Sequence, residues 1–236
     1  MTDRRVTAVC AIALAIAFNV PFTILGTTYD YPDILRRPAG EALDLFAAGG
    51  ASLILTWHAF ALTALAFAPM AIALSLTRER VATRPMLAVG AAILGALAGF
   101  AQAIGLWRWV FVVPGLARAH ADAAATADAK LAAERAFDVL NQYGGVAIGE
   151  HLGQLLTAAF IVTLALLQRG EGNRKTAWTG FAAGAAITVG TGEGLAIALG
   201  RSGETFGLIT IAGFAGLTVW LIATGVGLLR RQYPSA

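Results

Sequence analysis

Charged residues are scarce in this sequence. Only 13% of the 236 residues are Asp, Glu, Lys or Arg, whereas 58% are hydrophobic. A soluble domain of ordinary composition has about 25% charged residues. The mean hydropathy of +0.71 points the same way. The shortage of charge therefore excludes an ordinary soluble protein and indicates that the chain is surrounded by a lipid bilayer.

Cysteine is almost absent as well. Cys10 is the single cysteine, so an intrachain disulfide and a Cys-x-x-Cys zinc site are both excluded. The net charge is +3, but the basic residues are spread over short connections and form no stripe, so we expect no nucleic-acid partner.

Several catalytic motifs are also missing. The sequence contains no Gly-x-x-x-x-Gly-Lys-Ser/Thr loop, no Gly-x-Ser-x-Gly and no His-Glu-x-x-His. These absences speak against a P-loop ATPase, a hydrolase with a nucleophile elbow and a zinc protease. No lysine lies within an apolar run, so a retinal Schiff base is not expected either.

Long apolar runs are what the sequence does have. A transmembrane helix needs about 20 largely apolar residues. Six such spans are predicted, at residues 6–25, 51–76, 86–113, 144–167, 177–199 and 207–229. The first run ends without an Ala-x-Ala cleavage site, so we expect an uncleaved span. The predicted fold is all-α, a single domain over residues 1–236 formed by a bundle of about six transmembrane helices.

The distribution of Lys and Arg predicts the orientation. Ten basic residues lie at the two termini and in the short second and fourth connections, and six lie in the other three connections. The positive-inside rule therefore places both termini in the cytoplasm, and we predict a bacterial inner membrane. The long segments 26–50 and 114–142 then face outward. The second is rich in alanine, and we expect a helix on or above the outer surface.

Ionisable residues inside the predicted spans are few, and all fall in the outer half. Such groups are costly in hydrocarbon and usually face the bundle interior or a watery cavity. They are His58, Arg108, Glu150, His151 and Glu193. Their common depth predicts a polar pocket that opens to the outer side.

Each of these residues also has a structural interpretation. Arg108 stands between two tryptophans, which fits an arginine in an interfacial aromatic belt. Glu193 lies in the glycine-rich segment 190–194, where the helix could bend or end. His58 lies on an apolar face, as many core histidines do. His120 is expected to be a solvated residue of the outer segment.

Glu150 is the strongest candidate for a functional role. Apolar residues follow it for four turns, so it is not at the end of its span. In an α-helix it shares a face with Tyr143 and Gln154. A buried carboxylate needs a partner or a raised pKa. Glycines 145, 149 and 153 form a small-residue ridge on the same span, which predicts close helix packing.

Three sequence blocks resemble a known family. The blocks are Tyr31-Pro-Asp-Ile-Leu-Arg36, Trp107-Arg-Trp109 and Gly149-Glu-His-Leu-Gly153. They resemble an uncharacterised family of bacterial multi-pass integral membrane proteins, known only as a domain of unknown function. The resemblance implies a compact polytopic bundle and implies no activity.

The main functional hypothesis is an outer-facing pocket for an unknown small or lipid-like ligand. Its predicted walls are His58, Arg108, Glu150, His151 and Gln154, and a loop with Asp33 and Arg36 covers it. Glu150 would act as a general acid or base, or as a cation ligand, and Arg108 as an anion clamp. Enzyme status and the need for a cofactor stay open.

Three other classes of function are kept. His58 and His151, at matched depth on different helices, could bind haem or a metal ion. The Gly190–Gly194 segment could be the broken helix of a transporter. The polar residues could also only join helices in an accessory subunit of a membrane complex, and the oligomeric state is open.

Overall fold

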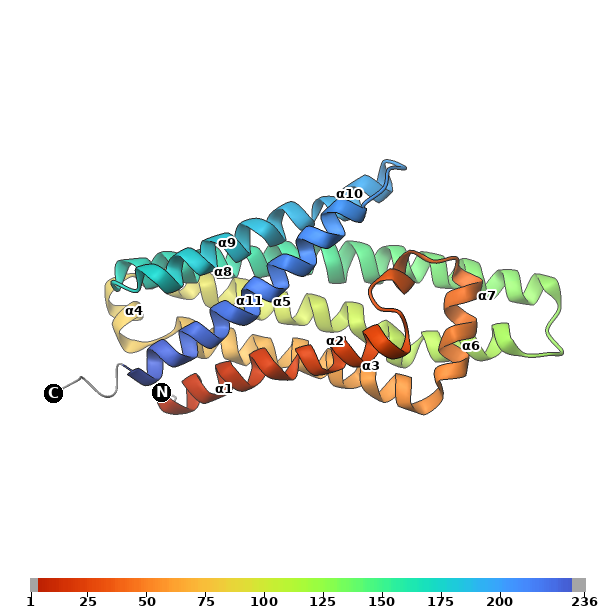
Figure 1. Cartoon of the computed structure of the whole chain (residues 1–236), viewed down its shortest axis with the longest axis horizontal. Helices are drawn as coiled ribbons and strands as arrows, with labels where there is room; N and C mark the ends of the chain where they lie inside the picture. Colours follow the sequence, from red (N-terminus) through yellow and green to blue (C-terminus); the bar gives the residue numbers. More distant parts are fainter. Residues whose placement is uncertain (1–3, 231–236) are drawn as a thin grey trace.

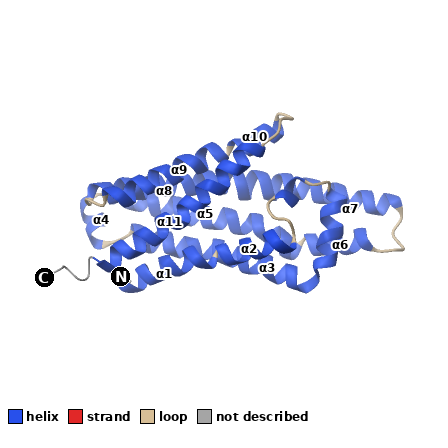
Figure 2. Ribbon diagram, in the orientation of Figure 1, coloured by secondary structure: helices blue, strands red, loops and turns tan. Residues whose placement is uncertain are grey.

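The computed structural model describes residues 4–230, and within that range every regular element is a helix (Figures 1 and 2). The elements are α1 (Arg4–Ala17), α2 (Asn19–Thr28), η1 (Asp33–Arg36), α3 (Ala39–Ser75), α4 (Arg78–Thr83), α5 (Pro85–Phe111), α6 (Val113–Ala121), α7 (Ala127–Leu140), η2 (Asn141–Leu152), α8 (Gly153–Gly170), α9 (Arg174–Gly190), α10 (Gly192–Ala198) and α11 (Glu204–Arg230). The short η1 is a 3-10 helix and η2 is a π-helix.

Six helical stretches are long and apolar enough to cross a membrane. They are α1–α2, α3, α5–α6, α7–η2–α8, α9–α10 and α11. The all-α prediction with six spans is therefore confirmed. The start of α1 and the end of α11 lie at the same end of the bundle as α4, which we call the inner end (Figure 1). The opposite end, with η1, α6, α7 and α10, is called the outer end, following the orientation that the sequence predicts.

Three of the six stretches are much longer than a bilayer requires. The α3, α5–α6 and α7–η2–α8 stretches have 37, 37 and 44 residues, whereas about 20 residues cross the hydrocarbon layer. Their surplus forms an outer extension made of residues 39–49 of α3 together with α6 and α7 (Figure 1). The predicted outer segment 114–142 is thus helical except for the turn at residues 122–126, and it continues the bundle along its long axis.

The outer extension begins at a kink in α3. Gly50 has a φ of 56° and a ψ of −148° inside that helix. This backbone conformation is strained for residues that have a Cβ atom, so glycine suits the position. The kink lets the first part of α3 leave the direction of the span below it.

Aromatic rings fill the core beneath the extension. Trp57 and Trp109 stack with their ring centroids 4.8 Å apart, and Tyr29 meets Trp109 edge-on at 5.5 Å. Both tryptophans are fully buried. The Tyr29 hydroxyl donates a hydrogen bond of 2.9 Å to the carbonyl of Ala42. These contacts join the loop after α2 to α3 and α5.

His120 anchors the extension, and the prediction that it is solvated was wrong. Its side chain is buried between α3 and α7. Nδ1 lies 2.8 Å from Asp44 Oδ1, and Nε2 lies 2.9 Å from Glu134 Oε1. The sequence could not show this pairing, because the three residues come from separate helices whose contacts depend on the tertiary fold. We call this arrangement the His120 clasp.

Candidate functional site

Two carboxylates from different helices meet on one guanidinium group at the outer end. Arg36 Nη2 donates a 2.6 Å hydrogen bond to Glu150 Oε2, and Arg36 Nε donates one of 3.0 Å to Glu193 Oε1. The three side chains come from η1, η2 and α10. They are 30%, 21% and 18% exposed, so water reaches the site only in part.

A chain of hydrogen bonds links α5 and η2 to the η1 turn that contains Arg36. Arg108, which is buried, donates to the carbonyl of Gly105 and, at 3.0 Å, to Asn141 Oδ1. Asn141 Nδ2 in turn donates to the carbonyl of Leu35 at 3.2 Å. Leu35 directly precedes Arg36, so these hydrogen bonds link Arg108 to the Arg36 turn through Asn141.

Glycines make room for this chain. A Cβ atom on Gly145 would lie 2.5 Å from Arg108 Nη2, because the guanidinium rests on the bare backbone of η2. A Cβ on Gly105 would lie 2.6 Å from the Cα of Gly149, so α5 and η2 touch backbone to backbone. The predicted glycine ridge is therefore a packing surface, and one of its members also seats Arg108.

The π-helix changes which side chains share a face. Sequence periodicity predicts that Glu150 lies with Tyr143 and Gln154 on an α-helical face. In the structure Tyr143 is 70% exposed, whereas Gln154 is buried. The prediction for Tyr143 was wrong because residues 141–152 follow the i→i+5 pattern of a π-helix. Such segments are rare in proteins, and those that occur are often found at functional sites.

Charge in the site is balanced but incompletely hydrogen-bonded. Burial alone would lower the pKa of Arg36, but the charges and hydrogen bonds of Glu150 and Glu193 outweigh it, so the pKa is raised. Burial, with Glu150 nearby, also raises the pKa of the Tyr31 phenol. Glu150 Oε1 is buried and accepts no hydrogen bond from residues 4–230. One oxygen of the carboxylate pair is thus left without a donor.

Among the described residues 4–230, none of the other predicted pocket residues forms a hydrogen bond with Glu150 or Glu193. His151 Nδ1 is 3.1 Å from the carbonyl of Thr191, at the break between α9 and α10. His58 Nδ1 on α3 is buried without a hydrogen-bond partner in the described part of the chain. Asp33 is exposed at the start of η1, and Gln154 is buried in α8. Roles for these four residues stay predictions.

A metal or haem site also stays a prediction. Among residues 4–230, no group of three or more His, Cys, Asp or Glu side chains is placed to hold a metal ion. In each of the Glu150 and Glu193 carboxylates, one oxygen is bonded to Arg36.

The predicted pocket walls did not include two members of the site, Asn141 and Glu193. Asn141 lies at the end of the charged outer segment, where a polar residue carries no signal of burial. Glu193 was recognised as an ionisable residue in a span, but its glycine-rich surroundings also fitted a loop. In the structure it lies on α10 against the start of α11, where a Cβ on Gly207 would be 3.4 Å from its Oε1.

Comparison with known proteins identifies the family and nothing more specific. Residues 6–225 match the family described as "Domain of unknown function (DUF4386)". No curated protein and no solved structure matches the chain. The family match covers nearly all of the sequence and agrees with the predicted resemblance, so the chain belongs to this family of proteins with a domain of unknown function.

Proposed function

We propose that the protein binds a small cationic ligand, with an ammonium or guanidinium group, between Glu150 and Glu193 at the outer end. The observation that supports this is the convergence of two carboxylates from separate helices on one positive group. Arg36 occupies that position in the structure and mimics the ligand's charge. The proposal refines the predicted outer-facing pocket and assigns no reaction.

The charges favour exchange of one cation for another. Glu150 and Glu193 have two negative charges, and Arg36 and Arg108 supply two positive ones. Arg108 is buried and bonded on two sides, whereas Arg36 is partly exposed on a four-residue turn. If the Arg36 side chain turns away, one uncompensated negative charge is left, which a ligand cation can neutralise.

The unpaired Glu150 Oε1 adds a second point of recognition. A buried acceptor without a donor costs about 1–3 kcal/mol. Arg36 reaches Oε2 of this carboxylate but not Oε1. A ligand with several N–H donors, such as a guanidinium, can bond both oxygens. The site thus offers a free ligand a contact that its tethered occupant does not make.

The first experiment replaces the tethered cation with a free one. The Arg36→Ala variant of the full chain, purified in detergent, should unfold at a lower temperature, and added methylguanidinium should restore most of the loss. Arg37→Ala is the matched control, because Arg37 is also ion-paired but on the exposed side of the same loop. The Arg36→Ala/Glu150→Gln double variant should not respond to methylguanidinium. An equal response of the two arginine variants, or rescue that survives Glu150→Gln, would contradict the proposal.

The second experiment uses the wild-type chain. A panel of amines and guanidines is screened for compounds that raise its unfolding temperature, since a ligand that binds only the folded state stabilises it. The shift should disappear in Glu150→Gln, while the variant alone stays folded. If no compound stabilises the wild type more than Glu150→Gln, the site is not a cation-binding site.

A further inference from the structure

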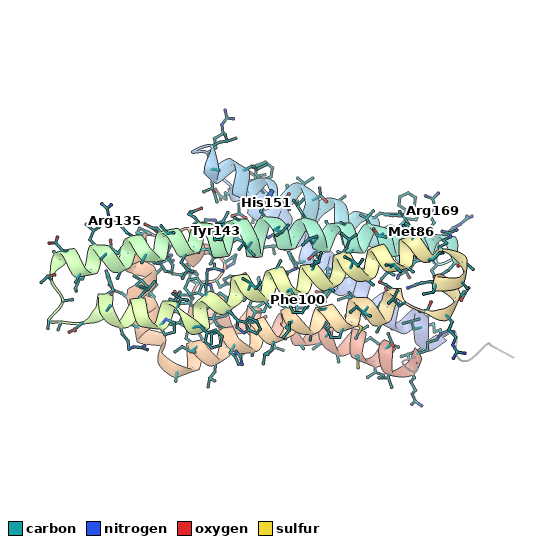
Figure 3. The ribbon with its side chains drawn as sticks, turned by 180° about the vertical axis from the view of Figure 1, so that it is seen from behind. Met86, Phe100, Arg135, Tyr143, His151 and Arg169 are labelled. Atoms are coloured by element: carbon teal, nitrogen blue, oxygen red, sulfur yellow. The ribbon has the colours of Figure 1, made fainter. Side chains whose placement is uncertain are left out.

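An open groove of about 360 Å³ lies at the inner end, far from the carboxylate pair. It is formed where α5 begins and α8 ends, and it is lined by Arg84, Leu87, Leu166, Arg169 and Gly170. Figure 3 shows Arg169 and Met86, which follows the groove residue Arg84 by two positions, at this same end of the bundle.

Within the described residues 4–230, no carboxylate pairs with the two arginines of the groove. Arg80 nearby is paired with Glu171, but neither Arg84 nor Arg169 forms an ion pair with any residue of the described range 4–230. Arg169 lies over the ring of Trp178, with its Cζ 5.8 Å from the ring centroid. Two guanidinium groups are thus available to an anion.

The rest of the groove lining is apolar and lies at the surface of the bundle. Leu166 is exposed and Leu87 is half-buried, and the neighbouring Met86, which does not line the groove, is exposed as well. Trp178, on the neighbouring α9, is exposed beside Arg169. Arginine, tryptophan and leucine occur together in this way at the boundary between lipid head groups and acyl chains. The groove therefore offers charge at one side and an apolar wall at the other.

We propose that this groove binds an anionic phospholipid of the leaflet at the inner end. The phosphate group would lie between Arg84 and Arg169, and an acyl chain would lie along Leu87 and Leu166. Basic pockets between transmembrane helices on the cytoplasmic side bind anionic lipid head groups in this manner. The proposal rests on the groove alone and does not depend on the cationic ligand at the outer end.

Gly170 gives the site a built shape as well as a charge. A Cβ atom at this position would lie 2.3 Å from Arg84 Nη1. The Arg84 guanidinium thus rests on the bare end of α8. A larger side chain at this position would displace Arg84 and fill the groove, without any change in net charge.

The test measures phosphatidylglycerol bound to the detergent-purified full chain by native mass spectrometry, with phosphatidylcholine as the neutral lipid. The wild type should retain more phosphatidylglycerol, and Arg84→Gln/Arg169→Gln should lower its affinity about tenfold. Arg174→Gln/Lys175→Gln is the matched control, because it removes the same charge at the same end from exposed residues that do not line the groove. Gly170→Leu should lower binding like the first variant.

Three results would overturn the proposal. One is equal loss of lipid in both double variants, which would indicate diffuse attraction rather than a site. Another is full binding by Gly170→Leu once circular dichroism shows that the variant is folded. The third is complete displacement of the lipid by inorganic phosphate, because the apolar wall should hold a lipid that phosphate alone cannot replace.

Discussion

The two ends of the bundle each contain an arginine paired with glutamate, and the two pairs differ in how completely they are satisfied. At the inner end, Arg80 forms two bonds to Glu171, of 2.5 and 2.9 Å, and a third to the carbonyl of Leu74. The side chains of Arg80 and Glu171 are 8% and 14% exposed. At the outer end, Arg36 is shared between two carboxylates and is more exposed, and Glu150 Oε1 has no donor among the described residues.

The difference fits a structural pair at the inner end and, under the proposed function, a pair that exchanges its partner at the outer end. The planar fork of Arg80 matches both oxygens of one carboxylate, which is the strongest arrangement that an arginine can form. Below it, Gln168 bonds Thr224 and Trp220 at 2.9 and 3.0 Å. The Arg36 site has no comparable closure. We therefore expect the inner pair to stabilise the fold and the outer pair to contribute less.

The largest effect should come from breaking the inner pair. Glu171→Gln leaves the Arg80 charge buried and should lower the free energy of unfolding by about 3 kcal/mol. Glu150→Gln should lower it by about 1 kcal/mol, because the outer pair is partly solvated. Unfolding in detergent measures both. Glu79→Gln, an exposed residue on α4, is the control and should have little effect. If Glu150→Gln costs as much as Glu171→Gln, the outer pair is a structural lock and the comparison fails.

A smaller effect should follow from filling the space that seats Arg108. Gly145→Ala places a Cβ against the guanidinium and should cost about 1–3 kcal/mol through displacement of Arg108 from Asn141. Gly144→Ala is the matched control, because it makes the same change at the adjacent residue, where the atom nearest to the added Cβ would be 3.7 Å away. Gly145→Ala should also weaken the methylguanidinium rescue of Arg36→Ala. Equal melting temperatures for the two glycine variants would show that Arg108 does not position the outer site.

The smallest effect should be a pH dependence of the outer extension. Only a protonated His120 can donate to both Asp44 and Glu134. Burial lowers the pKa of His120, but these two hydrogen bonds and charges raise it more, so the net shift is upward. A raised pKa in the folded state stabilises fully below the ordinary value of about 6.5, and the stabilisation is lost as pH rises through the folded-state pKa.

Hydrogen exchange can measure this dependence. The α7 amides of the wild type should be better protected than those of His120→Gln at low pH, and the difference should shrink as pH rises. Comparing the two proteins at each pH removes the intrinsic pH dependence of exchange. A difference in protection that stays constant as pH rises would show that protonation of His120 does not stabilise the outer extension.

Much of the fold was predictable from the sequence. Six apolar runs of sufficient length predict six helices, because the hydrophobic requirement of a span depends on composition and length alone. Glu150 was also identified from sequence as a carboxylate that needs a partner. The depth argument placed it in the outer half, and the structure brings it to Arg36, which had been predicted as part of the covering loop.

The details of the candidate site depended on the rotation of each helix about its axis and on contacts between residues far apart in the sequence. Helix periodicity cannot reveal a π-helix over residues 141–152, and this segment decides that Tyr143 points away from the site. Glu193 and Arg36 are 157 positions apart, so no local pattern connects them. Asn141 and His120 were missed because a polar residue in a charged segment looks the same whether it is buried by tertiary packing or solvated.

The uninterrupted run of α7, η2 and α8 has a mechanical consequence. These 44 residues form one rod that extends from the His120 clasp, past Glu150, to the groove at Arg169. A rod transmits torque, so a partner that turned the exposed tip about its axis would also turn the Glu150 carboxylate relative to Glu193, which lies on a different helix. The position of Glu150 relative to Glu193 thus depends on the same rod whose first helix is tied to α3 and α6 through His120.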